Sequence, residues 1–283
     1  MQLFDYHIHT TRSGHAKGTM EQYVQAAIAA GLGEMGFSDH LPLCRPEPTP
    51  WTVPHEELDA YIHDVLDLRA KYPQIPIRLG VEVDYLPGHV QATRDKLASL
   101  ELDYVIGSVH YLPAGAIQAA TAGGDVARPD FEWCVDHPAQ VEEFKRHQLD
   151  EVFTAYLRLL EQLAASGFCQ IIGHADLPKK FGHRPTGDLR EPYGRTAQAF
   201  ARHGVIVELN TAGLRKPAGE IYPNLEFLRV LRAADVPITL GSDSHAPEEV
   251  GAAFAQAIQL ARQAGYDTLH RWASPGRFAP VAI

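Results

Sequence analysis

Seven short apolar runs, each followed by a longer segment of helical pattern, constrain the fold of this chain more than any other feature. The runs fall at residues 2–7, 34–38, 75–83, 104–109, 169–172, 205–209 and 237–240. Helices are predicted at residues 20–30, 56–72, 89–99, 139–166, 192–203, 224–234 and 248–264. Short buried strands that alternate with helices indicate a parallel sheet, because each helix returns the chain to the start of the next strand.

The alternation runs through the whole chain without a Pro- or Gly-rich linker, which predicts one domain over residues 1–283. It favours a closed α/β barrel of about seven strand–helix units over an open, doubly wound sheet. Residues 111–138 interrupt the pattern and are predicted to be irregular. The segment after residue 264 contains Pro275 and Pro280 and is predicted to be coil.

Histidine or carboxylate residues stand at the ends of six of the seven predicted strands. In a parallel barrel the carboxyl ends of the strands meet on one face. The sequence therefore predicts one cavity that collects His7, His9, His40, Glu82, His110, His174, Asp243 and His245.

This residue set has the chemistry of a metal site. Imidazole and carboxylate together suit zinc, iron or manganese. His7 and His9 are two residues apart at a strand end, so their side chains point the same way and can chelate one ion. The ligands are too many for one tetrahedral ion, which predicts a cluster of ions bridged by a carboxylate.

Charge and cysteine usage exclude other functional classes. The net charge is −10, which disfavours binding to nucleic acids or anionic membranes through the overall field. No apolar run reaches the roughly 18–20 residues of a membrane helix, and no signal peptide is expected, so the cytoplasm is the expected location. The isolated Cys44, Cys134 and Cys169 indicate neither a disulfide framework nor a thiolate zinc site.

The ordered set of motifs resembles that of the polymerase and histidinol phosphatase (PHP) family over essentially the whole chain. The motifs are DYHIHT at 5–10, SDH at 38–40, GVEVD at 80–84, GSVH at 107–110, GHADL at 173–177 and GSDSH at 241–245. The segments at 210–216 and 241–251 resemble the histidinol-phosphatase branch in particular.

The resemblance implies a distorted (β/α)7 TIM-like barrel that holds up to three metal ions. By motif, the first ion would be bound by His7, His9, Glu82 and Asp243. Glu82 would bridge to a second ion bound by His110 and His174. A third ion would be bound by His15, His40 and His245. His15 enters only through the resemblance, because it lies on a predicted loop.

A centre of two to three divalent ions suits a phosphate dianion, because Glu82 and Asp243 offset only part of the positive charge of the ions. The sequence therefore predicts hydrolysis of a small-molecule phosphomonoester, with a metal-bound hydroxide at the Glu82 bridge as the nucleophile. The resemblance implies L-histidinol phosphate as the substrate and L-histidinol and phosphate as the products, in histidine biosynthesis.

Two basic residues are candidates for substrate binding. Lys180 and Arg215 follow the fifth and sixth predicted strands, and the resemblance implies that they contact the substrate phosphate. Three aspartates beside ligand histidines are candidates for orienting the imidazoles, namely Asp5, Asp39 and Asp176. Three acidic residues of the irregular segment are candidates for binding the ammonium or imidazole of the substrate, namely Asp130, Glu132 and Asp136.

Three alternatives remain open at the level of sequence. Another PHP-family phosphoesterase would act on a nucleoside phosphate or as a nuclease, but a nuclease needs a basic, aromatic-lined track, which the sequence does not show. An amidohydrolase would usually have eight strands and often a carboxylated lysine bridge. A non-catalytic metal-binding module would have closed, four-ligand sites.

Overall fold

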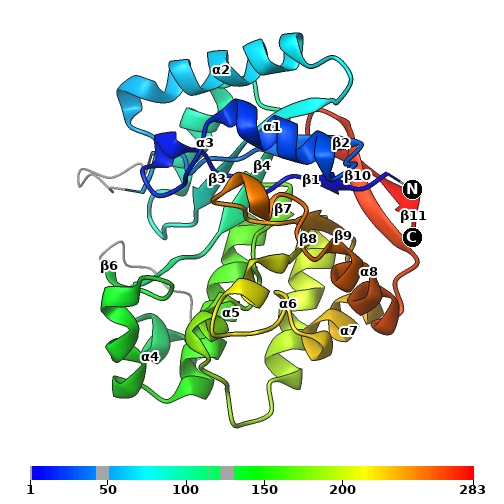
Figure 1. The fold of residues 1–283 in the computed structure, drawn as a ribbon. Helices are drawn as coiled ribbons and strands as arrows, with labels where there is room; N and C mark the ends of the chain where they lie inside the picture. Colours follow the sequence, from blue (N-terminus) through cyan, green and yellow to red (C-terminus); the bar gives the residue numbers. More distant parts are fainter. Residues whose placement is uncertain (1, 43–50, 114, 122–130) are drawn as a thin grey trace.

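The computed structural model describes residues 2–42, 51–113, 115–121 and 131–283 (Figure 1). Seven parallel strands form one sheet in the order β1-β2-β3-β4-β7-β8-β9. Their bounds are β1 Phe4–Asp5, β2 Glu34–Phe37, β3 Ile77–Asp84, β4 Tyr104–Ser108, β7 Ile171–Ile172, β8 Ile206–Asn210 and β9 Ile238–Gly241. All seven predicted strands are confirmed.

The two edges of this sheet approach each other and nearly close it. A parallel bridge joins Ile8 to Ser244, and the Tyr6 amide lies 3.5 Å from the Leu240 carbonyl oxygen. The predicted barrel of seven strand–helix units is therefore confirmed. Its interior is filled in part by Tyr104, whose hydroxyl donates to the carbonyl oxygens of Tyr6 and Phe37. Gly36 and Gly80 face this ring, and a Cβ at either position would clash with it.

Helices follow the strands and pack around the barrel. They are α1 Met20–Ala29, α2 Leu58–Lys71, α3 Val90–Ala98, α5 Leu149–Ser166, α6 Arg190–His203, α7 Leu225–Ala233 and α8 Phe254–Gln263. Thr19 is the N-cap of α1 and forms a capping box with Gln22. No described helix combines the length and the apolar character that a membrane crossing requires.

Two predicted helices are shorter than expected because the backbone leaves the helical region within them. Residues 139–166 divide into a 3-10 segment, Pro138–Arg146, and α5, with His147 in an extended conformation between them. Residues 248–264 begin as a 3-10 turn, Pro247–Glu249, and α8 starts only after Ala253, whose φ is 61°.

The prediction of coil after residue 264 is wrong. Residues Thr268–Ser274 (β10) and Arg277–Ala282 (β11) pair as an antiparallel hairpin. Pro275 lies in the turn between the strands, and Pro280 lies in β11, which pairs only with β10. A proline in such an edge strand removes no ladder hydrogen bond that the sheet needs.

This hairpin packs against the amino-terminal end of the barrel. The buried Glu34 carboxylate accepts hydrogen bonds from the Tyr6 hydroxyl (2.5 Å), Arg78 (3.0 Å) and Arg271 (2.9 Å). The Trp272 amide donates to the Tyr6 hydroxyl at 2.9 Å, and the Arg78 guanidinium lies 3.5 Å from the Trp272 ring centroid. The hairpin thus covers the end of the barrel opposite the predicted ligands.

The segment predicted as irregular contains short regular elements in its described part. They are β5 Tyr111–Pro113, α4 Ala116–Thr121 and β6 Phe131–Cys134, and β5 pairs with β6 in antiparallel fashion. This small sheet lies beside the carboxyl end of the barrel because it directly follows β4 and His110.

Candidate metal centre

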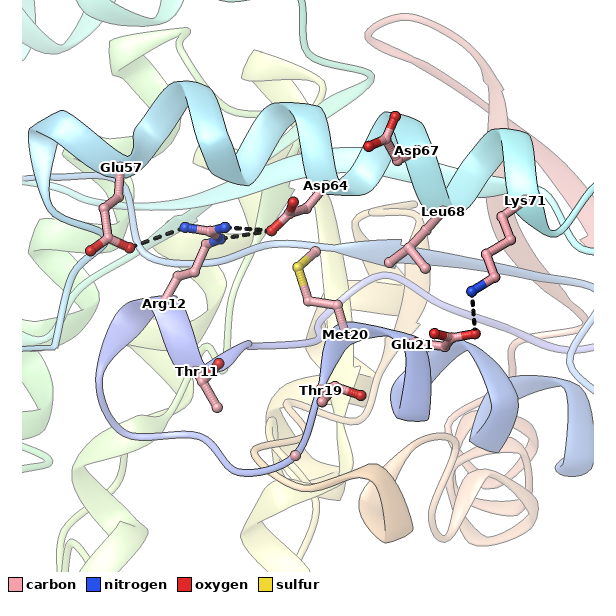
Figure 2. A pocket seen from close by; sticks show the side chains of 11 residues that line it. Thr11, Arg12, Thr19, Met20, Glu21, Glu57, Asp64, Asp67, Leu68 and Lys71 are labelled. Atoms are coloured by element: carbon pink, nitrogen blue, oxygen red, sulfur yellow. Dashed lines mark hydrogen bonds and ion pairs between the residues drawn. The ribbon is translucent and has the colours of Figure 1, made fainter.

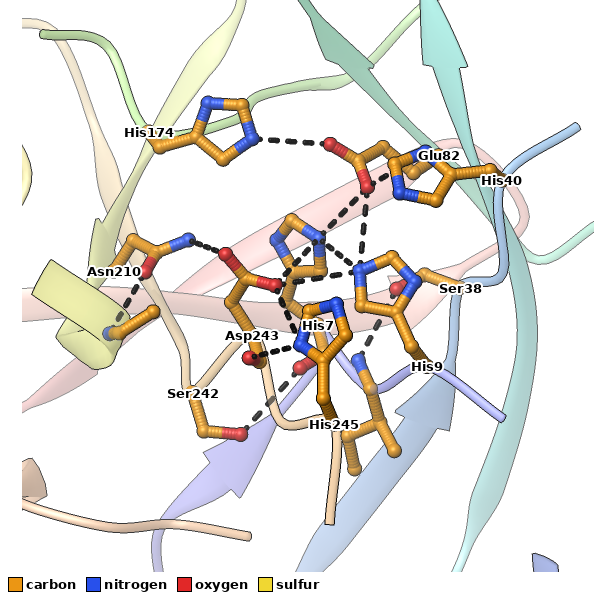
Figure 3. Close-up of polar contacts among 12 residues, drawn as sticks. His7, His9, Ser38, His40, Glu82, His174, Asn210, Ser242, Asp243 and His245 are labelled. Atoms are coloured by element: carbon orange, nitrogen blue, oxygen red, sulfur yellow. Dashed lines mark hydrogen bonds and ion pairs between the residues drawn. The ribbon is translucent and has the colours of Figure 1, made fainter. Parts of the chain in front are cut away.

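The nine predicted ligands lie together at the carboxyl ends of the barrel strands. Figure 3 shows all of them except His15 and His110. The first eight come from the strand ends identified in the sequence, and His15 comes from the loop after the 3-10 turn Thr11–Ser13. They surround a cavity of about 260 Å³. All of them except His7 line this cavity, and His7 is completely buried behind it.

Glu82 lies at the centre of the cluster with only 1% of its surface exposed. Its two carboxylate oxygens face two different groups of imidazoles. Oε2 lies 3.1 Å from a nitrogen of His7, 3.3 Å from His9 and 3.3 Å from His40. Oε1 lies 3.1 Å from His174 and 3.6 Å from His110. A carboxylate shared between two groups of nitrogen ligands has the arrangement of a bridging ligand.

The hydrogen bonds of His7 indicate which of its ring nitrogens can bind a metal ion. Nδ1 lies 2.8 Å from a Glu208 carboxylate oxygen, so we assign the ring proton to Nδ1. In the neutral ring, Nε2 then carries a lone pair that faces Glu82 Oε2 at 3.1 Å and His9 Nε2 at 3.1 Å. Ligand atoms of a tetrahedral ion with bonds of about 2.0–2.1 Å lie about 3.3 Å apart. These acceptors therefore fit around a cation.

Three further histidines have Nδ1 beside an acceptor in the same way, which leaves Nε2 for a metal ion. Nδ1 of His110 lies 2.7 Å from Asp84, Nδ1 of His15 lies 2.8 Å from a main-chain oxygen, and Nδ1 of His245 lies 3.0 Å from another. Metal-binding histidines usually donate their second N–H to such an acceptor. The donor set and its orientation thus fit divalent ions.

The candidate ligands form three groups, and within each group the ligand atoms lie within 4.8 Å of one another. His7, His9 and Asp243 form one group, as predicted for the first ion. The other two are His9 with His15 and His40, and His40 with Glu82 and His110. His40 thus adjoins ligands of every group, and its predicted assignment to a third ion stays a prediction.

The carboxyl groups and imidazoles of the cluster shift one another's pKa values. Burial alone would raise the pKa of the Glu82 and Asp243 carboxyl groups, but the surrounding imidazoles hold both well below the ordinary range. Burial would lower the pKa of His7, but Glu208, Asp243 and Glu82 outweigh it and raise that pKa. Burial and the adjacent His9 lower the pKa of His245 to about 3. Both carboxylates are therefore ionised, and His245 is neutral, as a ligand must be.

Two acidic residues that the sequence analysis did not assign position ligand histidines. Glu208, at the end of β8, accepts hydrogen bonds from His7 Nδ1, from the His174 amide at 2.8 Å and from Asn210 at 2.7 Å. Asn210 also donates to Asp243 Oδ2 at 3.1 Å. Asp84 holds His110. The signal was present, since Glu208 ends the one predicted strand without a ligand and Asp84 ends the GVEVD motif.

The aspartates predicted to orient imidazoles mainly hold loops instead. Asp5 accepts from the amides of Ser242 (2.9 Å) and Gly251 (3.0 Å). Asp176 pairs with the buried Lys179 at 2.8 Å. Asp39 bonds to Thr10, and its carboxylate lies 3.7 Å from His9 Nδ1, beyond hydrogen-bond distance.

The two predicted substrate ligands occupy different positions. Lys180 lines the cavity, and its Nζ lies 2.9 Å from Asp136 Oδ2. The Arg215 guanidinium donates to the carbonyl oxygens of Ser242 (2.8 Å) and Asp243 (3.1 Å), and among the described residues Lys216 rather than Arg215 lines the cavity. Contact of either residue with substrate stays a prediction. Asp130 and the side chain of Glu132 lie outside the described residues.

A more open groove of about 720 Å³ lies between α1 and α2 (Figure 2). Five of its six charged residues pair with one another. Arg12 contacts Glu57 at 3.0 Å and Asp64 at 2.5 Å, and Lys71 contacts Glu21 at 2.7 Å. It contains none of the clustered ligands, so the metal chemistry belongs to the smaller cavity.

Comparison with known proteins agrees with this geometry. The chain is 38% identical over 278 residues to a Deinococcus radiodurans protein named "Probable histidinol-phosphatase", and the match covers 96% of this chain and 99% of that protein. It is 27% identical over 269 residues to the histidinol-phosphatase of Bacillus subtilis, covering 90% and 97% of the two chains.

The fold also matches a solved structure, the histidinol phosphate phosphatase of Lactococcus lactis complexed with zinc, L-histidinol and phosphate. The TM-score is 0.76 at 21% identity, and the match covers 98% of this chain and 99% of the other. The family model of the PHP domain matches residues 5–212. The chain therefore belongs to the PHP domain family, together with the proteins named histidinol-phosphatase.

Proposed function

We propose that this protein is a metal-dependent phosphatase that hydrolyses L-histidinol phosphate to L-histidinol and phosphate. The observation that carries the proposal is the meeting of seven histidines, Glu82 and Asp243 at the open end of the barrel. The names of the relatives at 38% and 27% identity support the choice of substrate. In this proposal residues 1–283 act as one domain in the cytoplasm.

The ligands proposed for two to three divalent ions are the nine predicted ones, and zinc, iron and manganese all suit them. Bound ions would supply a nucleophilic hydroxide at neutral pH and would offset the charge of the phosphoryl oxygens. In this proposal Glu82 would be shared between ions, because each of its oxygens faces a separate group of imidazoles. Glu208 and Asp84 keep the Nδ1 protons of His7 and His110 away from the cavity.

The cavity walls also provide the cations that an anionic substrate needs. Lys180 and Lys216 line the cavity together with the ligands. In the proposed reaction they attract and orient the phosphate group, and Tyr222 and Leu177 also line the cavity. Arg215 donates hydrogen bonds to the carbonyl oxygens of Ser242 and Asp243 and thereby holds the main chain at Asp243.

The test is a metal analysis combined with a panel of phosphomonoesters. Protein stripped with a chelator should lose activity, and zinc or manganese should restore it. The panel should include L-histidinol phosphate, nucleoside monophosphates and p-nitrophenyl phosphate. The proposal expects kcat/KM to be highest for L-histidinol phosphate. Activity in a preparation shown to be metal-free, or a higher kcat/KM for nucleotides, would contradict it.

A further inference from the structure

His15 differs from the other candidate ligands in its exposure and in its support. Of the nine candidate ligands it alone is exposed, whereas the other eight are buried or half-buried. It lies on a loop rather than at the end of a barrel strand, so the hydrogen bonds of the sheet do not fix it. Its place in the cluster therefore depends on contacts that the loop itself makes.

The 3-10 turn Thr11–Ser13 sets the orientation of the His15 ring. The turn ends at Gly14, whose φ of 79° lies in the left-handed region that favours glycine. The carbonyl oxygen of Ser13 then lies 2.8 Å from Nδ1 of His15. A ring proton held on Nδ1 leaves Nε2 for a metal ion. The position of the turn thus decides where this nitrogen points.

The His15 ring faces three other imidazoles of the cluster. Its centroid lies 4.7 Å from the ring of His245, 5.4 Å from His40 and 5.6 Å from His9. The ligand atoms of His9, His15 and His40 lie within 4.8 Å of one another. A shift of the loop would therefore remove one imidazole from this group and leave the ligands at the strand ends in place.

Arg12, in the middle of the turn, connects the loop to the helix α2 (Figure 2). Its Nε and Nη2 atoms contact Asp64 Oδ2, which lies in α2, at 3.0 and 2.5 Å. Its Nη1 atom contacts Glu57, in the turn that precedes α2, at 3.0 Å. The donors of a guanidinium have fixed directions, so two carboxylates that hold it also hold the turn.

We propose that Arg12 is a positioning residue for His15: its ion pairs with Glu57 and Asp64 hold the 3-10 turn, and the turn holds the His15 imidazole in the metal centre. The inference rests on the proposed metal-dependent function and concerns one ion, the one bound by His15. The side chains are partly exposed, 23% for Arg12 and 44% for Asp64, so each ion pair contributes only modestly. In this proposal the ion at His15 is the first that the protein releases.

The variant Arg12→Gln tests the proposal through zinc binding. Zinc affinities are measured by titration against a chromophoric chelator, and bound zinc is counted after partial stripping. Two partly exposed ion pairs together account for about a 5- to 30-fold change in an equilibrium constant. Arg12→Gln should therefore bind its weakest zinc ion about 5- to 30-fold less tightly, with the other zinc affinities and the circular dichroism spectrum unchanged.

The matched control is Lys71→Gln. Lys71 lines the same groove as Arg12 and pairs with Glu21 at 2.7 Å, but it does not contact the loop that carries His15. This variant should change no zinc affinity. An unchanged zinc affinity in Arg12→Gln, or an equal loss in Lys71→Gln, would overturn the proposal.

A second background separates positioning of His15 from a general structural role. His15→Ala should lose the same zinc ion, and Arg12→Gln should then have no further effect on zinc binding, because Arg12 acts only through His15. An added loss in this background, or unaltered zinc binding in His15→Ala alone, would overturn the proposal. Failure of the zinc-loaded, unaltered protein to hydrolyse any phosphomonoester would instead refute the proposed function.

Discussion

Replacement of Glu208 by glutamine tests whether hydrogen bonding behind the metal centre controls the metal ligands. Oε1 of Glu208 accepts from the His174 amide (2.8 Å) and from Asn210 Nδ2 (2.7 Å), so the amide oxygen of a glutamine must take this place. The amide NH₂ then takes the place of Oε2, which lies 2.8 Å from His7 Nδ1. Facing a donor, Nδ1 must become an acceptor, and the ring proton moves to Nε2.

That proton occupies the lone pair that His7 would offer to a metal ion. Loss of such an orienting partner reduces metal affinity by about 10- to 100-fold. The unfolding free energy should fall by about 1–3 kcal/mol if the ring keeps its proton on Nδ1 and the two donors remain opposed. The two effects are alternatives, because a change of tautomer relieves the opposed donors.

The assay is a competition between the protein and a chromophoric chelator for zinc, with circular dichroism and urea unfolding on the same samples. Glu161→Gln is the matched control, because Glu161 is also a buried carboxylate and binds Arg158 at 2.6 Å and Arg195 at 2.9 Å, away from the cavity. It should lose stability but keep its zinc affinity. A zinc affinity of Glu208→Gln within twofold of that of the unaltered protein, together with an unchanged unfolding free energy, would refute the reasoning.

Four further outcomes are expected. Glu82→Gln should nearly abolish turnover with an unchanged circular dichroism spectrum, because a neutral amide bridges two cations poorly; full metal content with normal kcat would contradict the bridge. Arg215→Ala should lower metal content and kcat/KM together, because Arg215 donates to the carbonyl oxygens of Ser242 and Asp243; a fall in kcat/KM of about 30- to 150-fold at unchanged metal content would instead assign Arg215 to the substrate phosphate. Burial would lower the pKa of His110, but Asp84 and neighbouring carboxylates raise it to about 10. A metal ion must therefore displace a proton at neutral pH, and zinc affinity should fall at least about tenfold for each pH unit from 8 to 6; a flat profile in chelator competition would contradict this. Glu34→Gln should cost about 2–4 kcal/mol of unfolding free energy in urea while kcat/KM changes less than twofold, because Glu34 lies at the opposite end of the barrel.

The barrel could be predicted because its strands are buried on both sides and read as apolar runs. The same pattern located eight of the nine candidate ligands, since each of these eight lies at the carboxyl end of an apolar run. The hairpin β10–β11 escaped prediction because its residues are only partly buried and its prolines are typical of coil. Tertiary contacts, such as the packing of Trp272 on Arg78 and the Arg271–Glu34 ion pair, show why this segment is ordered.

The contacts between distant segments of the chain are the part of the site that the sequence could not predict. Glu208 and Asp84 are visible as acidic residues at strand ends, but the sequence does not show which side chain each one holds. The Lys180–Asp136 pair joins residues that lie 44 positions apart on two loops, so no local sequence pattern predicts it. His15 lies on a loop, and only the ordered motif set of a family identifies it.

The stacking of Arg78 on Trp272 also provides an optical signal. The chain has three tryptophans, of which Trp51 and Trp133 lie near the open end of the barrel and Trp272 lies at the other. The Trp272 indole is covered by a guanidinium on one face and donates to the Asp103 carbonyl oxygen at 3.2 Å. If the hairpin separates from the barrel, this indole becomes hydrated and its fluorescence shifts to longer wavelength. With Trp51 and Trp133 replaced by phenylalanine, fluorescence would thus follow detachment of the β10–β11 hairpin from the barrel separately from events at the metal centre.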